Sequence, residues 1–256
     1  MSDGIALVAL TYLEFHLLFV LPPILALLVL AGPAERPYAG PFGVALLAVV
    51  AVLYTTPWDN HLIATGVWAY GEGAVLFRIW HAPIEEYLFF VLQPVLTSLW
   101  LARLPTRSDH AFGISVPQRA LGLLGGGLVT ALGLFFFAES TYYLGTLLLW
   151  ASPVLAIQWA FGWPVLWERR RTLALGVGVP TAYLAAVDRI AIELGIWAFD
   201  EAFMTGLAIF GLPIEELLFF ALTNVFLVQG LLLFWWVTDR WEQVRTVWNR
   251  SAPTGS

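Results

Sequence analysis

Two short acidic motifs carry the strongest chemical signal in this chain. Each reads Pro-Ile-Glu-Glu and runs into leucine and phenylalanine, first at residues 83–90 and again at residues 213–220. A carboxyl group at the start of an apolar helix is expensive to ionise without a partner, so its environment can make it an unusually strong or weak acid. The motifs therefore indicate proton-transfer chemistry. The catalytic candidates are Glu85, Glu86, Glu215 and Glu216.

Helix-start preferences offer another explanation for either motif taken alone. Proline is favoured at the first helical position, and carboxylates in the first turn interact well with the helix dipole. Two copies, both followed by Leu-Phe-Phe, favour function. Because adjacent residues point about 100° apart on a helix, we expect one glutamate of each pair to face a cavity and react while the other holds it by hydrogen bonds. The sequence leaves open which member does which.

A further acid lies at the outer end of the helix before each motif. Asp59 and Asp188 are each followed by a Gly-x-Trp-Ala-aromatic segment, so we expect them to join the glutamates in one site rather than only to cap loops or pair with arginine. In that site Arg189 would keep one carboxylate ionised while a more desolvated one stays protonated. The other expected substrate-binding or supporting residues are Asn60, Trp58, Trp68, Trp197, Tyr87, Phe89 and Phe219.

Composition places these acids in an integral membrane protein. Of 256 residues, 60% are hydrophobic and only 12% are charged, against about 25% charged in a typical soluble domain. At about 20 apolar residues per span, the sequence predicts seven helices, the first of them a retained span and not a signal peptide. Cysteine is absent, so disulfides and cysteine-ligated metals are excluded. The predicted ranges are roughly 5–30, 41–57, 83–101, 119–138, 142–161, 172–190 and 213–237.

An internal repeat organises the helices. The glutamate motifs recur at a spacing of 130 residues, and the segment 66–70 recurs 129 residues later as 195–199. An odd number of spans separates the copies, which predicts an all-α fold of parallel 3+1+3 design with a pseudo-twofold axis along the membrane normal. The expected units are a first three-helix repeat at 1–104, a linking helix at 105–140, a second repeat at 141–240 and a cytoplasmic tail at 241–256.

The basic residues, all arginine, predict the orientation. Only Arg78 and Arg189 fall on the side of the acidic motifs, and the other ten fall on the side of the C-terminus. The positive-inside rule then puts the C-terminus in the cytoplasm and the N-terminus outside the cell membrane. The ten are Arg36, Arg103, Arg107, Arg119, Arg169, Arg170, Arg171, Arg240, Arg245 and Arg250.

With its two Pro-Ile-Glu-Glu motifs, each preceded by an aspartate and a Gly-x-Trp, the chain resembles the membrane-integral lycopene cyclase family over nearly its whole length. The resemblance implies conversion of the linear ends of lycopene into β-ionone rings, through γ-carotene to β-carotene, without net redox change. It also implies dependence on the acidic motif at the four glutamates. Asp188-Arg189 replaces Asp59-Asn60 in the second copy, so the halves need not be equivalent.

The chemistry of polyene cyclisation agrees with these residues. A proton must reach the terminal double bond, the neighbouring double bond must attack the cation, and a ring proton must leave; a protonated carboxyl and a nearby carboxylate can do this. The chain shows no dinucleotide fingerprint, Walker loop or metal cluster, so we expect neither cofactor nor metal. The expected partners are lycopene and the lipid bilayer, without nucleic acid, and association with other carotenoid enzymes or with itself stays open. The 13 tryptophans suit a hydrocarbon and a passing carbocation.

Other classes of membrane protein would need different residues, or leave the same residues with another role. A retinal-binding photoreceptor needs a lysine for its Schiff base, and the chain has none. A SWEET-like transporter shares the 3+1+3 plan but needs a polar lining near the midplane, whereas the charges here gather at one end. A cyclase acting on C50 carotenoids or making ε or γ rings, or a hydratase that captures the cation with water, stays open.

Overall fold

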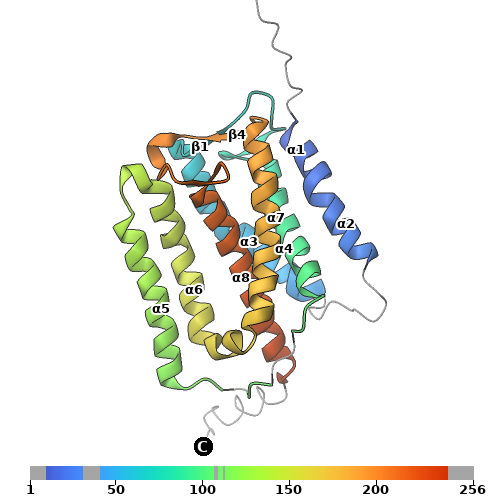
Figure 1. Cartoon of the computed structure of the whole chain (residues 1–256), viewed down its shortest axis with the longest axis vertical. Coiled ribbons are helices and arrows are strands. Elements are labelled where there is room, and N and C mark those ends of the chain that lie inside the picture. The colour runs from blue at the N-terminus through green and yellow to red at the C-terminus, as the bar shows by residue number, and fades with distance from the viewer. Residues whose placement is uncertain (1–9, 31–40, 107–108, 112, 242–256) are drawn as a thin grey trace, which may run out of the picture.

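The computed structural model describes residues 10–30, 41–106, 109–111 and 113–241 (Figure 1). Within them, seven helical segments are long and apolar enough to cross a membrane, which confirms the predicted number. The first segment comprises α1 (Tyr12–Phe15), a π-helical stretch (His16–Val20) and α2 (Leu21–Val29). The others are α3 (Pro41–Thr65), α4 (Ile84–Leu101), α5 (Val116–Phe135), α6 (Tyr142–Glu168), α7 (Arg170–Glu193) and α8 (Ile214–Thr238).

The predicted end of the second helix at residue 57 is wrong, because α3 continues through Pro57 to Thr65. A proline inside a helix removes one backbone hydrogen bond, yet the helix continues, and Asp59, Asn60 and Leu62 of the next turn are all buried. Asp59 consequently lies within the helix, where its orientation is fixed. The predicted start of the first helix at residue 5 lies outside the described residues.

Helix α8 runs through the middle of the bundle, with α7, α3, α4 and α6 around it, while α5 and the first helix flank it on opposite sides (Figure 1). The contact of α5 with α6 depends on two glycines. A Cβ atom at Gly122 would lie 2.4 Å from the backbone of Trp159, and one at Gly126 would lie 2.3 Å from the Cβ of Ala156. The small residues therefore permit close packing of these helices.

Polar side chains join three helices in the interior of the bundle. Asn224 of α8 accepts a hydrogen bond from Thr97 of α4 (2.7 Å) and donates one to Thr181 of α7 (3.2 Å). Gln93 of α4 donates to Thr223 of α8 at 2.8 Å. All five residues are buried. Such interhelical bonds fix the register of the two helices that carry the glutamate motifs.

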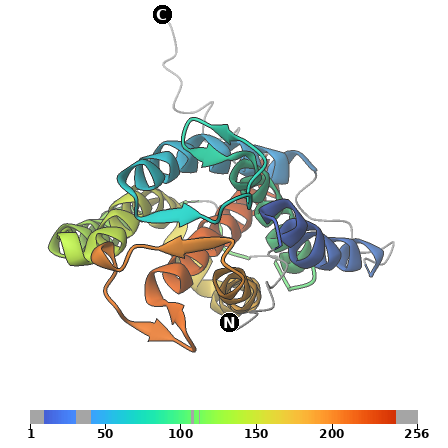
Figure 2. The ribbon, with the colours of Figure 1, turned by 90° about the horizontal axis from the view of Figure 1, so that it is seen from above.

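Short strands close one end of the bundle. Strands β1 (Trp68–Tyr70) and β4 (Trp197–Phe199) pair antiparallel, with Trp68 opposite Phe199 and Tyr70 opposite Trp197. The two aromatic segments that the repeat relates thus lie side by side, as the view from above shows (Figure 2). Two hairpins, β2–β3 (Arg78–Ile79 with Ala82–Pro83) and β5–β6 (Ala208–Ile209 with Leu212–Pro213), precede α4 and α8.

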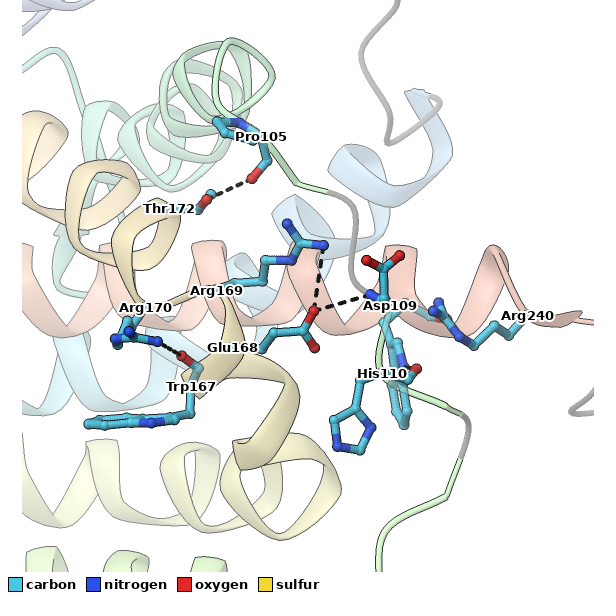
Figure 3. A network of polar contacts seen from close by, with 10 residues as sticks. Pro105, Asp109, His110, Trp167, Glu168, Arg169, Arg170, Thr172 and Arg240 are labelled. Atoms are coloured by element: carbon cyan, nitrogen blue, oxygen red, sulfur yellow. Dashed lines mark hydrogen bonds and ion pairs between the residues drawn. The ribbon is translucent and has the colours of Figure 1, made fainter.

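The opposite end of the bundle carries basic residues (Figure 3). Glu168 at the end of α6 accepts a hydrogen bond from the backbone N–H of Asp109 (3.1 Å) and pairs with Arg169 (3.8 Å). Thr172 of α7 donates to the carbonyl of Pro105 at 2.6 Å. These contacts tie the connection between α6 and α7 to the segment that follows α4.

Candidate active site

The two glutamate helices begin in the same way. Pro83 and Pro213 have extended backbones and precede the first helical residues, Ile84 and Ile214. Each proline also belongs to a hairpin strand. The prediction that these prolines occupy the first helical position is therefore wrong by one residue. Because the proline ends a strand and its neighbour starts a helix, the two glutamates of each motif fall in the first turn.

The first glutamate of each pair accepts a hydrogen bond from a backbone N–H group. Glu85 accepts a hydrogen bond from the N–H of Leu76 (2.9 Å), and Glu215 accepts one from the N–H of Thr205 (2.8 Å). Both donors lie in the loop that precedes the hairpin, and both carboxyl groups are almost fully buried. These glutamates therefore hold the loop and hairpin against the start of the helix.

The second glutamate of each pair faces a shared cavity. Glu86 accepts a hydrogen bond from the hydroxyl of Tyr70, and Glu216 accepts one from the hydroxyl of Tyr143, each at 2.6 Å. Burial, together with the neighbouring Glu86, raises the pKa of Tyr70 well above its ordinary value. Tyr70 thus remains a donor at neutral pH. The Tyr70 oxygen also accepts a bond from the indole of Trp68 at 3.1 Å.

The two aspartates lie beside these glutamates. Asp188 accepts a hydrogen bond from the indole of Trp197 at 3.1 Å. Both Asp59 and Asp188 are buried, and among the described residues the Oδ2 atom of each has no hydrogen-bond partner. Both line the same cavity as Glu86 and Glu216. The structure thus brings four of the six acids that the sequence singled out to one place.

The cavity has a mostly aromatic wall. None of the described residues that line it is basic. Among the described residues, no group of three or more His, Cys, Asp and Glu is arranged to hold a metal ion. Besides the four acids, the lining residues are Tyr12, Phe15, Trp58, Trp68, Phe89, Tyr143, Leu184, Val187, Trp197, Phe199, Phe219 and Phe220.

Five of the expected supporting residues line the cavity, namely Trp58, Trp68, Trp197, Phe89 and Phe219. The other three support the hairpins instead, which corrects the expectation for them.

Asn60 accepts hydrogen bonds from the N–H groups of His81 (2.8 Å) and Ala82 (2.9 Å), and the Tyr87 hydroxyl donates to the carbonyl of Ile79 (3.0 Å). Both side chains therefore hold the first hairpin. Neither Asn60 nor Tyr87 lines the acidic cavity.

Arg189 forms an ion pair with Glu193, one helical turn away, at 2.6 Å. Its side chain also packs so closely on Gly211 that a Cβ there would lie 2.6 Å from the guanidinium. The expected pairing of Arg189 with an acid of the site is wrong. As a neighbour of Asp188 on the same helix, it points about 100° away from it and contacts the second hairpin.

Sequence reasoning missed several residues at the site, and Tyr70, Tyr143 and His16 make the polar contacts among them. Tyr70 lies in the repeated aromatic segment, and its register opposite Trp197 could not be known before β1 and β4 were paired. Tyr143 of α6 enters the cavity, whereas its neighbour Tyr142 contacts His61 (2.8 Å) instead. His16 donates from Nε2 to the carbonyl of Glu85 at 2.9 Å, which secures the start of α4 from the first helix.

Comparison with known proteins identifies the family. The lycopene cyclase family model matches residues 9–104 and 139–236. The chain is 49% identical to a lycopene beta-cyclase of Halobacterium salinarum over 234 residues, which is 91% of this chain and 99% of that protein. The chain belongs to the lycopene cyclase family.

Fungal members of the lycopene cyclase family are longer. The chain is 35% identical to a bifunctional lycopene cyclase/phytoene synthase of Sporisorium reilianum, with 88% of this chain and 35% of that protein covered. It is 32% identical to the corresponding protein of Gibberella fujikuroi, with 86% and 39% covered. No solved structure matches the chain.

Proposed function

We propose that this chain is a lycopene β-cyclase, which converts lycopene through γ-carotene to β-carotene. The observation that carries the proposal is that Glu86 and Glu216, one from each motif, face one aromatic cavity and each accept a tyrosine hydrogen bond. Membership of the lycopene cyclase family and the printed function of the Halobacterium salinarum relative support the same substrate.

The cavity acids supply both proton-transfer steps. Four carboxyl groups around one small cavity, with no basic residue among its described lining residues, cannot all be ionised except at a large electrostatic cost. A protonated carboxyl donates its proton to the terminal double bond, the neighbouring double bond attacks the resulting cation, and a carboxylate removes a ring proton. One proton enters and one leaves, so the product is an isomer of the substrate. The donor is Glu86 or Glu216, and the aspartates complete the acidic wall.

The aromatic wall favours the cation between these steps. Indole and phenyl faces attract a positive charge, and tryptophan does so most strongly. Trp58, Trp68 and Trp197 line the cavity together with Phe89 and Phe219. Their rings also exclude water, and that exclusion favours loss of a proton over capture of the cation by water.

Glu85 and Glu215, the first glutamates of the two pairs, contribute by positioning Glu86 and Glu216. Glu85 and Glu215 accept hydrogen bonds from the loop amides of Leu76 and Thr205. They are positioning residues, because they fix the helix start from which Glu86 and Glu216 enter the cavity. This assigns different roles to the two members of each pair.

The two halves form a parallel 3+1+3 arrangement around a pseudo-twofold axis, with units at 1–104, 105–140, 141–240 and 241–256. Three observations support this. Equivalent segments pair as β1 and β4, equivalent hairpins precede α4 and α8, and the family model matches two stretches that leave out residues 105–138. The active site lies between the halves, so both are needed for it.

The protein lies in the cell membrane with the N-terminus outside and the C-terminus in the cytoplasm. Arg169, Arg170 and Arg171 lie at the connection between α6 and α7, the end of the bundle opposite the hairpins (Figures 1 and 3). By the positive-inside rule that end is cytoplasmic. Lycopene, which is soluble in lipid, reaches the site from the bilayer.

Expression of the chain in a lycopene-accumulating bacterial host tests the proposal. Chromatography of the extracted pigments should show γ-carotene and β-carotene in place of lycopene. Unchanged lycopene in cells whose membranes contain the folded protein would contradict the assignment. A new pigment with a hydroxyl group or another ring type would show a related reaction instead.

A further inference from the structure

A second cavity lies along the same helices as the acidic cavity. It lies between α3, α4, α6 and α8. Its lining residues on α8 reach Leu227, eleven residues beyond Glu216, which corresponds to about 16 Å along a helix. On α3, α4 and α6, its residues lie further from the acidic end than those of the acidic cavity, and on α8 the two cavities share Phe219.

The two cavities meet at a wall of stacked rings. Phe219 lines both of them. Its ring lies 6.0 Å from Trp58 at an angle of 11° and 6.4 Å from Trp150 at 29°, and the two indoles lie 4.7 Å apart at 20°. The exposed faces of such nearly parallel rings suit contact with a flat conjugated chain.

The wall of the second cavity suits a hydrocarbon. Three of its polar side chains direct their hydrogens to protein partners. Gln93 donates to Thr223 (2.8 Å), Gln158 to the carbonyl of Phe226 (2.9 Å) and Tyr54 to the carbonyl of Trp150 (2.6 Å). Apart from Thr55 and Thr223, the rest of the wall is aliphatic or aromatic.

The second cavity also reaches the outer surface of the bundle. Val50 of α3 lines it and is 49% exposed. On a helix that crosses a membrane, such a surface faces lipid. An apolar molecule can therefore enter from the side without crossing water.

We infer that this second cavity is a binding site for the polyene chain behind the reacting end. The inference rests on the proposed cyclase function. Only the terminal part of lycopene takes part in ring formation, so the rest of the molecule needs an apolar path away from the acids. Of the other cavities, the groove of Pro23, Leu27, Leu96, Trp100 and Val179 is apolar too. Among its described lining residues it shares none with the acidic cavity.

The repeat provides a matched control. Val179 lies 129 residues after Val50, which is the spacing of the repeated segments, and is 42% exposed. It lines the groove between α2, α4 and α7 instead of the second cavity. The same substitution at both positions therefore changes equivalent helices but only one proposed site.

The absence of cysteine allows a test on folded protein. Val50→Cys and Val179→Cys are purified, reacted with benzyl methanethiosulfonate, and assayed for lycopene conversion before and after reaction. We expect the reaction at position 50 to lower conversion at least tenfold and that at position 179 by less than twofold. We also expect lycopene to slow the reaction at position 50 several-fold and to leave the rate at position 179 unchanged.

Equal losses at the two positions, or no protection of position 50 by lycopene, would overturn the inference. Ala51→Phe, which fills the second cavity, should likewise lower conversion, and full conversion by that variant would count against the site. Lycopene conversion by the unsubstituted chain is measured separately and tests the proposed function itself. If it cyclises lycopene while the position-50 adduct is fully active, only the second site is wrong; if it does not cyclise lycopene, the proposed function itself fails.

Discussion

Tyr70 and Glu86 share a 2.6 Å hydrogen bond at the acidic cavity, yet the repeat places Phe199, which has no hydroxyl, at the position equivalent to Tyr70. The second half forms the corresponding contact differently, from Tyr143 on α6 to Glu216. Both cavity glutamates thus accept a phenol, but one phenol comes from a strand and the other from a helix. The two glutamates therefore have the same type of hydrogen-bond partner, but different elements of the fold supply it.

Replacement of the cavity acids should stop the reaction. Glu86→Gln and Glu216→Gln keep the size of the side chain and remove its ability to exchange a proton. We expect at least one of them to lower conversion by more than about a hundredfold, in line with the usual contribution of general acid–base catalysis. Pigment analysis in the lycopene host, normalised to protein in the membrane, measures this.

Glu85→Gln and Glu215→Gln are the matched controls. A glutamine oxygen can still accept the loop N–H of Leu76 or Thr205, so we expect most activity to remain. Glu85→Ala removes the acceptor and should lower stability by about 1–3 kcal/mol, seen as a lower midpoint of thermal unfolding in detergent. If the controls lost activity as completely as the cavity variants, the division of roles would be incorrect.

Loss of the phenol hydrogen bonds should slow the chemistry. Tyr70→Phe and Tyr143→Phe each remove a bond that stabilises the carboxylate left when the proton departs. A hydrogen bond to a charged group contributes about 1.5–3 kcal/mol, so the rate should fall roughly tenfold to a hundredfold. Initial rates at saturating lycopene measure the effect. Unchanged rates in both variants would show that the phenols have no part in the reaction.

Tyr70 should also make stability depend on alkaline pH. Because its pKa is raised in the folded protein, the unfolded chain releases this proton first, at about pH 10. Between that value and the folded pKa, the unfolded state binds fewer protons, so stability falls as pH rises. Thermal unfolding from pH 8 to 11 should therefore show a steeper decline for the unsubstituted chain than for Tyr70→Phe. Parallel declines would contradict this.

Two neighbouring glycines on α5 should respond in opposite ways to alanine. Gly126→Ala brings a methyl group onto Ala156, and such overpacking costs about 1–3 kcal/mol. At Gly127 a Cβ would meet nothing within 4 Å, so Gly127→Ala should stabilise the helix by about 0.5–1 kcal/mol. Unfolding midpoints of the two variants compare them directly. If both midpoints moved in the same direction, the close contact between α5 and α6 would not determine how each glycine position responds to alanine.

The number of membrane-spanning helices and many residues of the candidate site could be predicted from the sequence. Long apolar segments predict seven spans because a helix satisfies its backbone hydrogen bonds within one segment, as the bilayer requires. The doubled Pro-Ile-Glu-Glu motif marked the acids, and the aromatic segments marked residues such as Trp68 and Trp197 that line the cavity. These signals are local in the chain, so no knowledge of packing was needed to find them.

The tertiary structure alone decided which acids face each other. Glu85 and Glu86 are adjacent, and only the rotation of α4 about its axis sends one to a loop amide and the other to the cavity. The same holds for Tyr142 and Tyr143 on α6, and for Asp188 and Arg189 on α7. Sequence sets the spacing of side chains along a helix. The direction in which each side chain points depends on packing against helices more than a hundred residues away in the chain, and on whether burial overrides a helix breaker such as Pro57.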